Sequence, residues 1–140
     1  MMEKQEFVYA MRISKLAEND YFIDYPFEGM AINASAETLN EAVELAKSSL
    51  EFTLFDLYEA KEPFPEMAEQ ALADLEKGKG ANQYITLIAT NLTAILKRFS
   101  EEPVKRMVSI KKYQDFYLKN NDISISKYVQ EKIDQDIQRT

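Results

Sequence analysis

The clearest pattern of side chains suited to recognition lies between residues 104 and 110, where successive side chains fall into two sets that would point to opposite sides of a strand. Lys105, Met107 and Ser109 share one side of this run, as every second side chain on a β-strand does. Lysine and serine hydrogen-bond to base edges in the major groove of DNA, and methionine can contact a thymine methyl group. The run therefore predicts a strand whose polar face reads bases.

The opposite side of the run is mainly apolar and predicts a face that packs on helices. We expect the stem of Arg106 to lie along those helices while its guanidinium reaches a phosphate or an acid. Lys111 follows at once and is a further candidate for phosphate contact. The side chains on this face are Val104, Arg106, Val108 and Ile110.

Two amphipathic helices are predicted to follow the strand. The first places Tyr113, Phe116 and Tyr117 on one face, and the Asn-Asn-Asp sequence at 120–122 tolerates the left-handed backbone that ends a helix. The second carries apolar residues at helical spacing. Its apolar residues are Ile125, Tyr128, Val129, Ile133 and Ile137.

The start of the second helix has two possible roles. Ser124 or Ser126 is placed to cap the helix. The same hydroxyl groups, with the first amide groups of the helix and Lys127, are also placed to hold a DNA backbone phosphate. Capping and phosphate binding explain the serines equally well at this stage.

A strand and two helices of this size cannot form a stable fold alone, because the strand has no partner and the helices bury too little surface. A symmetric homodimer solves both problems, since two copies of the strand pair antiparallel and four helices cover one face of the ribbon. The segment 104–137 here resembles the ribbon-helix-helix DNA-binding modules. A two-stranded ribbon of that kind fits the major groove.

The composition of the 140-residue chain excludes several kinds of chemistry. It contains no cysteine and no histidine, which excludes thiolate catalysis and removes the commonest general base and metal ligand. The charged N-terminal sequence is unlike a signal peptide, and no apolar run is long enough for a membrane span. We therefore expect a cytoplasmic protein with no membrane association, no cofactor and no metal.

Charge is divided unevenly along the chain. Residues 104–140 contain eight basic and five acidic residues, a net charge of +3, whereas residues 1–103 contain nine basic and nineteen acidic residues, a net charge of −10. An acidic segment of this kind favours a basic partner, while the local density of lysine and arginine near 104–112 favours phosphate contact.

The acidic part of the chain predicts an antiparallel sheet followed by a long helix, and hence an α+β fold covered mainly on one side. Alternation predicts strands at 7–13 and 21–25, a third short strand marked by Met30, Ile32 and Ala34, and a turn at 16–20. Ser35 or Thr38 is predicted to cap the helix, and Glu41 stands where a capping box requires an acid.

The main apolar stripe of that long helix runs from Leu39 to Leu57, and Leu45, Phe52 and Phe55 lie off it. Either these three pack under the following loop or they form a partner contact. Prolines at 63 and 65 are predicted to break the helix. A short helix at 67–75, an interior strand at 84–89, apolar on both faces, and a helical stripe from Leu92 to Phe99 follow.

Carboxylates could in principle bind metal ions for nuclease chemistry, which needs several of them converging from adjacent strands. The predicted strands and turns offer only Asp20, Asp24 and Glu28. We therefore predict that the chain is not an enzyme, and that Asp24 is a solvated or partner-facing acid.

The N-terminal part resembles the HicB antitoxins in the order and spacing of its motifs. The proline-containing turn is at Pro26 and Gly29, and the capped helix begins with Leu39, Glu41 and Ala42. The proline pair at 63–65 and the strand YITLIATNL at 84–92 resemble later parts of that pattern. The segment 104–133 is similar to the ribbon-helix-helix of those HicB proteins that end in one. The family often has proline where Lys111 stands and glycine where Asn121, Ala34 and Ser35 stand.

The resemblance implies a domain at 1–99 with a partial RNase H-like fold, a hinge at 100–103 and a ribbon-helix-helix at 104–140. It implies an antitoxin that binds and neutralises a HicA-type RNase toxin and represses its own operon. Candidate toxin contacts are acids in the strand turns and on the long helix: Asp24, Glu28, Glu41, Glu44 and Glu51.

Two alternatives to the antitoxin remain open. The first is a stand-alone ribbon-helix-helix transcription regulator without a toxin. The second is an interaction module whose C-terminal segment only dimerises. Dimers of the C-terminal segment also leave open a further pairing into tetramers.

Overall fold

A computed structural model describes residues 6–100 and 107–139 of the chain. The chain divides into two compact units, Glu6–Thr90 and a C-terminal unit that begins at Asn91. Of the predicted hinge at 100–103, only Ser100 lies within the described residues, so the predicted domain boundary remains a prediction.

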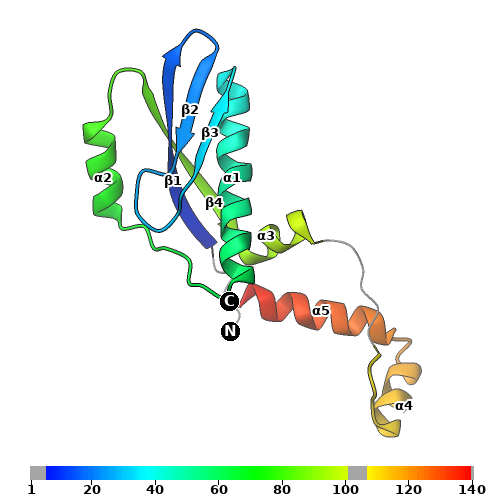
Figure 1. The fold of residues 1–140 in the computed structure, drawn as a ribbon. Coiled ribbons are helices and arrows are strands. Elements are labelled where there is room, and N and C mark those ends of the chain that lie inside the picture. The colour runs from blue at the N-terminus through cyan, green and yellow to red at the C-terminus, as the bar shows by residue number, and fades with distance from the viewer. Residues whose placement is uncertain (1–5, 101–106, 140) are drawn as a thin grey trace. The chain divides into compact units, whose positions relative to one another are not determined.

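The N-terminal unit is built on a four-stranded sheet (Figure 1). Its strands are β1 (Glu6–Ala17), β2 (Asp20–Asp24), β3 (Asn33–Ala36) and β4 (Gln83–Asn91), in the order β3-β2-β1-β4. The first three strands form the predicted antiparallel meander, with Ile13 opposite Ile23 and Ile23 opposite Ala34. The turn between β1 and β2 is tight, and Asn19 adopts a left-handed φ of 56° there.

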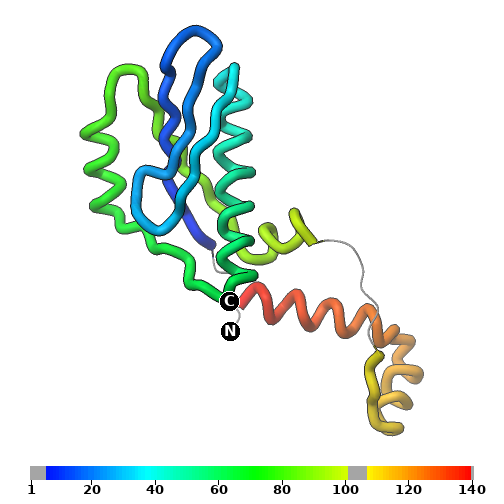
Figure 2. Tube along the Cα trace, viewed as in Figure 1, coloured from blue at the N-terminus to red at the C-terminus, as the bar shows by residue number. Residues whose placement is uncertain are grey.

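Strand β4 also runs antiparallel to β1. The carbonyl of Asn82, just before β4, accepts a hydrogen bond from the backbone N–H of Lys15 near the end of β1, at 2.9 Å. The start of β4 therefore lies beside the end of β1, and the trace in Figure 2 shows the two strands running in opposite directions.

Helix α1 (Leu39–Glu59) covers one face of the sheet and contacts β1, β2 and β3. The Oγ1 atom of Thr38 accepts a hydrogen bond from the Glu41 backbone N–H at 3.2 Å, which confirms the predicted cap. The Glu41 carboxylate accepts from the backbone N–H of Glu37 rather than from that of Thr38. The other predicted cap, Ser35, lies within β3.

The core lies between α1 and the sheet. Small residues on α1 let the helix approach closely, and the alternation of β1 and β2 points apolar side chains toward it. All of the following side chains are buried: Met11, Ile13, Ile23, Ala42, Ala46, Leu50 and Leu54.

The segment after α1 is fixed to the edge of this core. Tyr9 donates a hydrogen bond from its phenol to the carbonyl of Pro65 at 2.6 Å, and the Ala10 N–H lies 3.2 Å from Sδ of Met67. Gly29 has a φ of 110°, and a Cβ at this position would lie 2.9 Å from Cβ of Pro65. The predicted need for glycine in this turn is therefore confirmed by both conformation and space.

Several predicted boundaries differ from the structure. Helix α1 ends at Glu59, followed by Lys61 with a φ of 58°, so it stops before the prolines reach it. The short helix α2 spans Glu69–Gly78, so it begins two residues later and ends three residues later than predicted. Strand β1 continues to Ala17, and β3 begins only at Asn33. Met30 and Ile32 lie in the segment that connects β2 to β3, and their side chains are buried. Their alternation with exposed residues therefore resembled that of a strand.

The prediction that β4 is an interior strand is wrong, because β4 lies at the edge of the sheet. Only one of its two apolar faces is buried. Ile88 and Thr90 are buried, while Leu87 remains 55% exposed and Ala89 is also exposed. Apolar residues on both faces of a strand indicate burial on both faces only when another strand or helix covers each of them.

The C-terminal unit contains α3 (Leu92–Phe99), α4 (Lys112–Asn120) and α5 (Ile125–Gln138). The Asn91 side chain caps α3 by accepting from the Ala94 N–H at 2.8 Å, and α3 contacts α5. The turn between α4 and α5 has Asp122 at a φ of 53°, which confirms the predicted left-handed residue at this point. Within the described residues, no helix is both long and apolar enough to cross a lipid bilayer.

We predict that Tyr9→Phe makes stability less sensitive to alkaline pH. Burial, with smaller contributions from Tyr25 and Glu66, raises the pKa of Tyr9 to about 12. An unfolded tyrosine ionises near pH 10, so the stability that Tyr9 contributes is complete below pH 10 and is lost as pH rises toward 12. The variant should lose about 1 kcal/mol at pH 8 through the missing hydrogen bond.

The measurement is urea unfolding at pH 8 and at intervals above pH 10. The difference in unfolding free energy between wild type and variant should shrink as pH rises. Tyr84→Phe, at a position that is 44% exposed, serves as the matched control and should follow the wild-type curve. A constant difference between wild type and Tyr9→Phe would contradict the prediction.

Candidate nucleic-acid and partner-binding surfaces

The predicted base-reading residues fall at the border of the described part of the chain. Lys105 and Arg106 lie outside the described residues, as does Val104. Met107 is fully exposed and Ser109 is exposed, in a segment (107–110) that forms no helix and no hydrogen-bonded strand within the single chain. The predicted strand would find its partner in a second copy, so it remains a prediction.

Helix α4 begins at Lys112, directly after Lys111, which stands where the resemblance suggests proline. The Lys111 backbone N–H donates to Oε1 of Gln114 at 2.9 Å, which satisfies a donor that proline would lack. The Lys111 side chain is exposed at this N-terminal position. It remains available for phosphate contact.

The structure at the N-terminus of α5 bears on the two roles predicted for its serines, helix capping and phosphate binding. Ser124 occupies the N-cap position, but its side chain makes no capping hydrogen bond. Ser126 lies in the first turn of the helix, and both serines and Lys127 are exposed. The geometry therefore leaves these groups together at one helix end, with the hydroxyl of Ser124 not used as a cap.

The helices α4 and α5 expose the apolar residues that the sequence placed on one face of each. None of their described residues is buried. The Phe116 side chain is 55% exposed, in a position where a monomeric fold would normally bury it. We call the following exposed residues the apolar tail face: Tyr113, Phe116, Tyr117, Tyr128 and Ile133.

Asp24, predicted as a solvated or partner-facing acid, is bound by an arginine of the same sheet. Arg12 lies opposite Asp24 in the β1–β2 register, and its Nε and Nη2 atoms donate to the two carboxylate oxygens at 3.0 and 2.6 Å. The hydrogen bond to Asp24 raises the pKa of Arg12. Asp24 can meet a partner only as part of this ion pair.

Sequence reasoning did not find the role of Arg12. The strands that carry Arg12 and Asp24 are joined by a tight turn at Asn19, but the register shifts between Lys15 and Ala17, so counting outward from the turn would place Asp24 opposite Ile13. The turn predicted at 16–20 did not reveal this irregularity.

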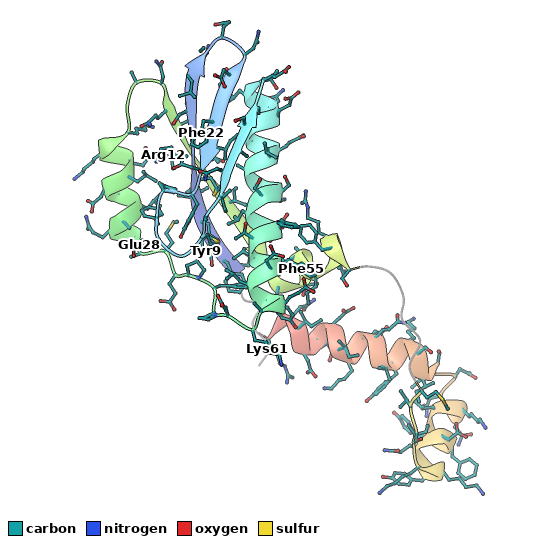
Figure 3. All side chains as sticks on the ribbon, viewed as in Figure 1. Tyr9, Arg12, Phe22, Glu28, Phe55 and Lys61 are labelled. Carbon is teal, nitrogen blue, oxygen red and sulfur yellow. The ribbon has the colours of Figure 1, made fainter. Side chains whose placement is uncertain are left out.

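The remaining acid candidates do not form one cluster. Glu28 lies in the connection between β2 and β3, near the lower end of α2 in Figure 3, and is exposed. Glu41 and Glu44 are exposed near the N-terminal end of α1, which is at the upper end in Figure 1. Glu51 is only 2% exposed and accepts a hydrogen bond from Thr90 at 2.7 Å, so it is part of the interior.

The aromatic residues off the main stripe of α1 have different environments. Phe52 is 53% exposed, while Phe55 and Leu45 are partly buried. The choice between packing under the following loop and a partner contact, which the sequence left open for these residues, stays open for Phe52.

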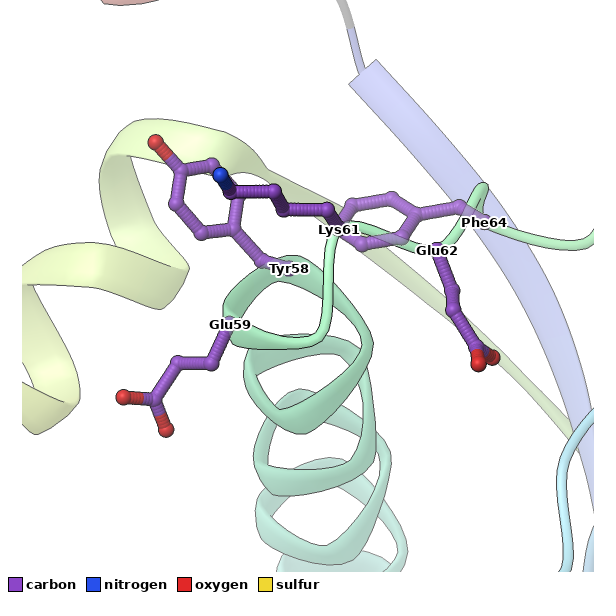
Figure 4. A pocket seen from close by; sticks show the side chains of 5 residues that line it. All are labelled: Tyr58, Glu59, Lys61, Glu62 and Phe64. Atoms are coloured by element: carbon purple, nitrogen blue, oxygen red, sulfur yellow. The ribbon is translucent and has the colours of Figure 1, made fainter.

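A hollow of about 450 Å³ lies at the C-terminal end of α1 (Figure 4). The Lys61 side chain extends between the rings of Tyr58 and Phe64, and Glu59 and Glu62 point away from it. Across residues 6–100 and 107–139, no three acidic side chains are grouped closely enough to hold a metal ion.

Known proteins resemble this chain in structure. No family model matches the chain, and no curated protein matches its sequence. A chain of a toxin-antitoxin complex from Streptococcus pneumoniae shares its fold with a TM-score of 0.50 and 21% identity, over 94% of this chain and 99% of that one. The antitoxin HicB of Burkholderia pseudomallei gives a TM-score of 0.50 and 17% identity, over 91% and 93%.

The chain has the fold of a HicB antitoxin. The similarity covers more than nine tenths of both chains, so it includes the C-terminal unit as well as the sheet. The predicted α+β class is confirmed. In this chain the fold consists of an acidic N-terminal unit and a C-terminal unit with an exposed apolar face.

Proposed function

We propose that this protein is a cytoplasmic HicB-family antitoxin that neutralises a small basic HicA-type RNase toxin by direct binding and represses its own operon. In this proposal it is not an enzyme. The observation that carries it is the HicB fold over nearly the whole chain, shared with a chain of a toxin-antitoxin complex. The proposal extends to the finer architecture, a partial RNase H-like sheet followed by a ribbon-helix-helix.

The N-terminal unit supplies the toxin-binding part. Residues 6–90 contain sixteen acidic and six basic residues, a net charge of −10. An RNase needs a positively charged surface to hold its substrate, so an acidic protein is attracted to that surface and can block it. Glu28, Glu41 and Glu44 are exposed for such contacts.

The C-terminal unit supplies a homodimer. Helices α4 and α5 have no buried residue, yet they retain the apolar tail face at regular helical spacing. Two copies that pair through residues 104–110 would cover this face with each other's helices and give each strand its missing neighbour. Exposed aromatic residues at such a density support association.

The same dimer supplies the DNA-binding surface. In a two-stranded ribbon, Lys105, Met107 and Ser109 would appear twice on the outer face, at a size that fits the major groove. Arg106, Lys111 and the N-terminus of α5, with Ser124, Ser126 and Lys127, would contact phosphates on either side. The exposure of Met107 and Ser109 supports this arrangement.

We expect co-expression of this chain to restore growth to cells that make the small basic protein encoded beside it. The two proteins should co-purify, and their association should slow as salt concentration rises, because the acidic unit attracts a basic surface. Growth assays and stopped-flow binding measure these effects. Loss of growth despite abundant, folded antitoxin would overturn the toxin-neutralising role and leave a stand-alone regulator.

We predict that Phe116→Lys converts the dimer to a monomer, because it places a charge in the apolar tail face at the centre of the interface. Sedimentation at micromolar concentration should show half the wild-type mass. Gln138→Lys adds the same charge on the polar side of α5 and should leave the dimer intact. A wild-type chain that sediments as a monomer would contradict the proposed assembly.

We expect the double variant Lys105→Ala with Ser109→Ala to lose operator binding by about 1 to 3 kcal/mol for each base contact removed. Fluorescence anisotropy with the operator and with an unrelated duplex measures the change in specificity. Lys77→Ala removes one positive charge from α2 and is the control. Equal affinity of wild type and double variant for the operator would mean that the C-terminal unit only dimerises.

A further inference from the structure

Within the part of the chain that the structure describes, the edge strand β4 has none of the residue types that normally protect the edge of a sheet. It is nine residues long and lies at the end of the strand order β3-β2-β1-β4. Its sequence, QYITLIATN, contains no charged residue and no proline. Natural proteins shield long edge strands with lysine, proline or a bulge, so an edge of this kind is open to a further strand.

The backbone groups that face outward from β4 can be identified from its pairing. The Asn82 carbonyl points toward β1, where it accepts from Lys15, while the Gln83 N–H turns away to the Gly80 carbonyl. Because the N–H and C=O of one residue point to the same side in an antiparallel strand, this direction alternates along β4. The N–H groups of Ile85, Leu87 and Ala89 therefore point away from β1.

A groove runs beside this edge and supplies side-chain contacts. It has a volume of about 270 Å³ and lies between residues 86–89 of β4 and the α1 residues Val43, Glu44 and Lys47. Val43 is 43% exposed and Leu87 is 55% exposed, so the groove has an apolar lining with charged groups at its rim. This combination suits an extended peptide whose alternate side chains fill a pocket.

We propose that β4 is the site at which a strand of the basic toxin is added to the sheet, antiparallel or parallel to β4, with its side chains in the groove beside α1. The proposal rests on the proposed function and names the surface that the toxin uses. Backbone hydrogen bonds to Ile85, Leu87 and Ala89 provide the contacts, and Glu44 accepts a basic side chain at the rim.

Charge decides between a toxin and a second copy of this chain as the occupant. The unit that carries β4 has sixteen acidic and six basic residues, so two such units repel each other, whereas a basic protein is attracted. Because β4 itself carries no charge, the strand repels neither partner. The negative charge of the rest of the unit attracts the basic partner and repels a second copy.

The test follows backbone amide hydrogen exchange by NMR in the full-length chain, alone and in complex with the basic protein that co-purifies with it. The amides of Ile85, Leu87 and Ala89 should exchange roughly tenfold or more slowly in the complex. The amides of Thr86 and Ile88, which face β1, should be protected already in the free chain. Unchanged exchange at the outward amides in a formed complex overturns the β4 site and leaves the antitoxin function standing.

Two variants separate backbone pairing from side-chain contact. Leu87→Pro removes an outward N–H, which an edge strand tolerates because that group does not pair with β1. It should weaken toxin binding about tenfold or more, while Leu87→Ala, which keeps the N–H, should weaken it less. Thermal unfolding checks that both variants fold.

Equal losses for Leu87→Pro and Leu87→Ala would overturn strand addition in favour of a side-chain contact. Protection of the outward amides in the free chain that rises with its own concentration would assign β4 to a second copy, and this also overturns the proposal. If no complex forms at all, both the β4 site and the proposed function fail.

Discussion

The packing of α1 on the sheet is the interaction on which the rest of the N-terminal unit depends. Ala42 and Ala46 let the helix lie close to the strands, and Leu50, Leu54, Met11 and Ile13 are all buried in the layer between α1 and the sheet. These residues leave almost no surface exposed, so the stability of the unit is concentrated in one layer. The outer groups of the helix and the edge of the sheet are thereby free to vary for recognition.

The two units differ in how far their apolar side chains are buried. The N-terminal unit has its own core and carries its excess of acidic residues on the outside. Helices α4 and α5 have regular apolar spacing but bury none of their residues. The proposed function would divide its two activities along this line, since the N-terminal core is complete in a single copy whereas the apolar tail face would be covered only in the proposed dimer.

The sequence predicted the elements that rest on local rules. The cap at Thr38, the glycine at Gly29 and the left-handed residue at Asp122 follow from short-range sterics and hydrogen bonding, and the structure confirms all three. The predicted helices α1, α4 and α5 are also present, because their apolar periodicity is strong.

The sequence did not predict features that depend on distant partners. The edge position of β4 follows from how four strands pair, and apolar periodicity cannot distinguish an edge strand with an exposed face from a central one. The Arg12–Asp24 pair depends on a register shift between Lys15 and Ala17 that the predicted turn did not reveal. The burial of Glu51 follows from the position of Thr90, which lies 39 residues away in the sequence.

The contacts of the segment between α1 and α2 have a consequence for how this part of the chain can evolve. Pro65 touches Tyr9 and lies over Gly29, and Met67 reaches the backbone of β1, so the chain is fastened just before α2 begins. Helix α2 itself buries no residue. Its exposed positions are therefore free to vary, while Ala71, Leu72 and Leu75 stay partly buried and the anchor in front of the helix holds the scaffold unchanged.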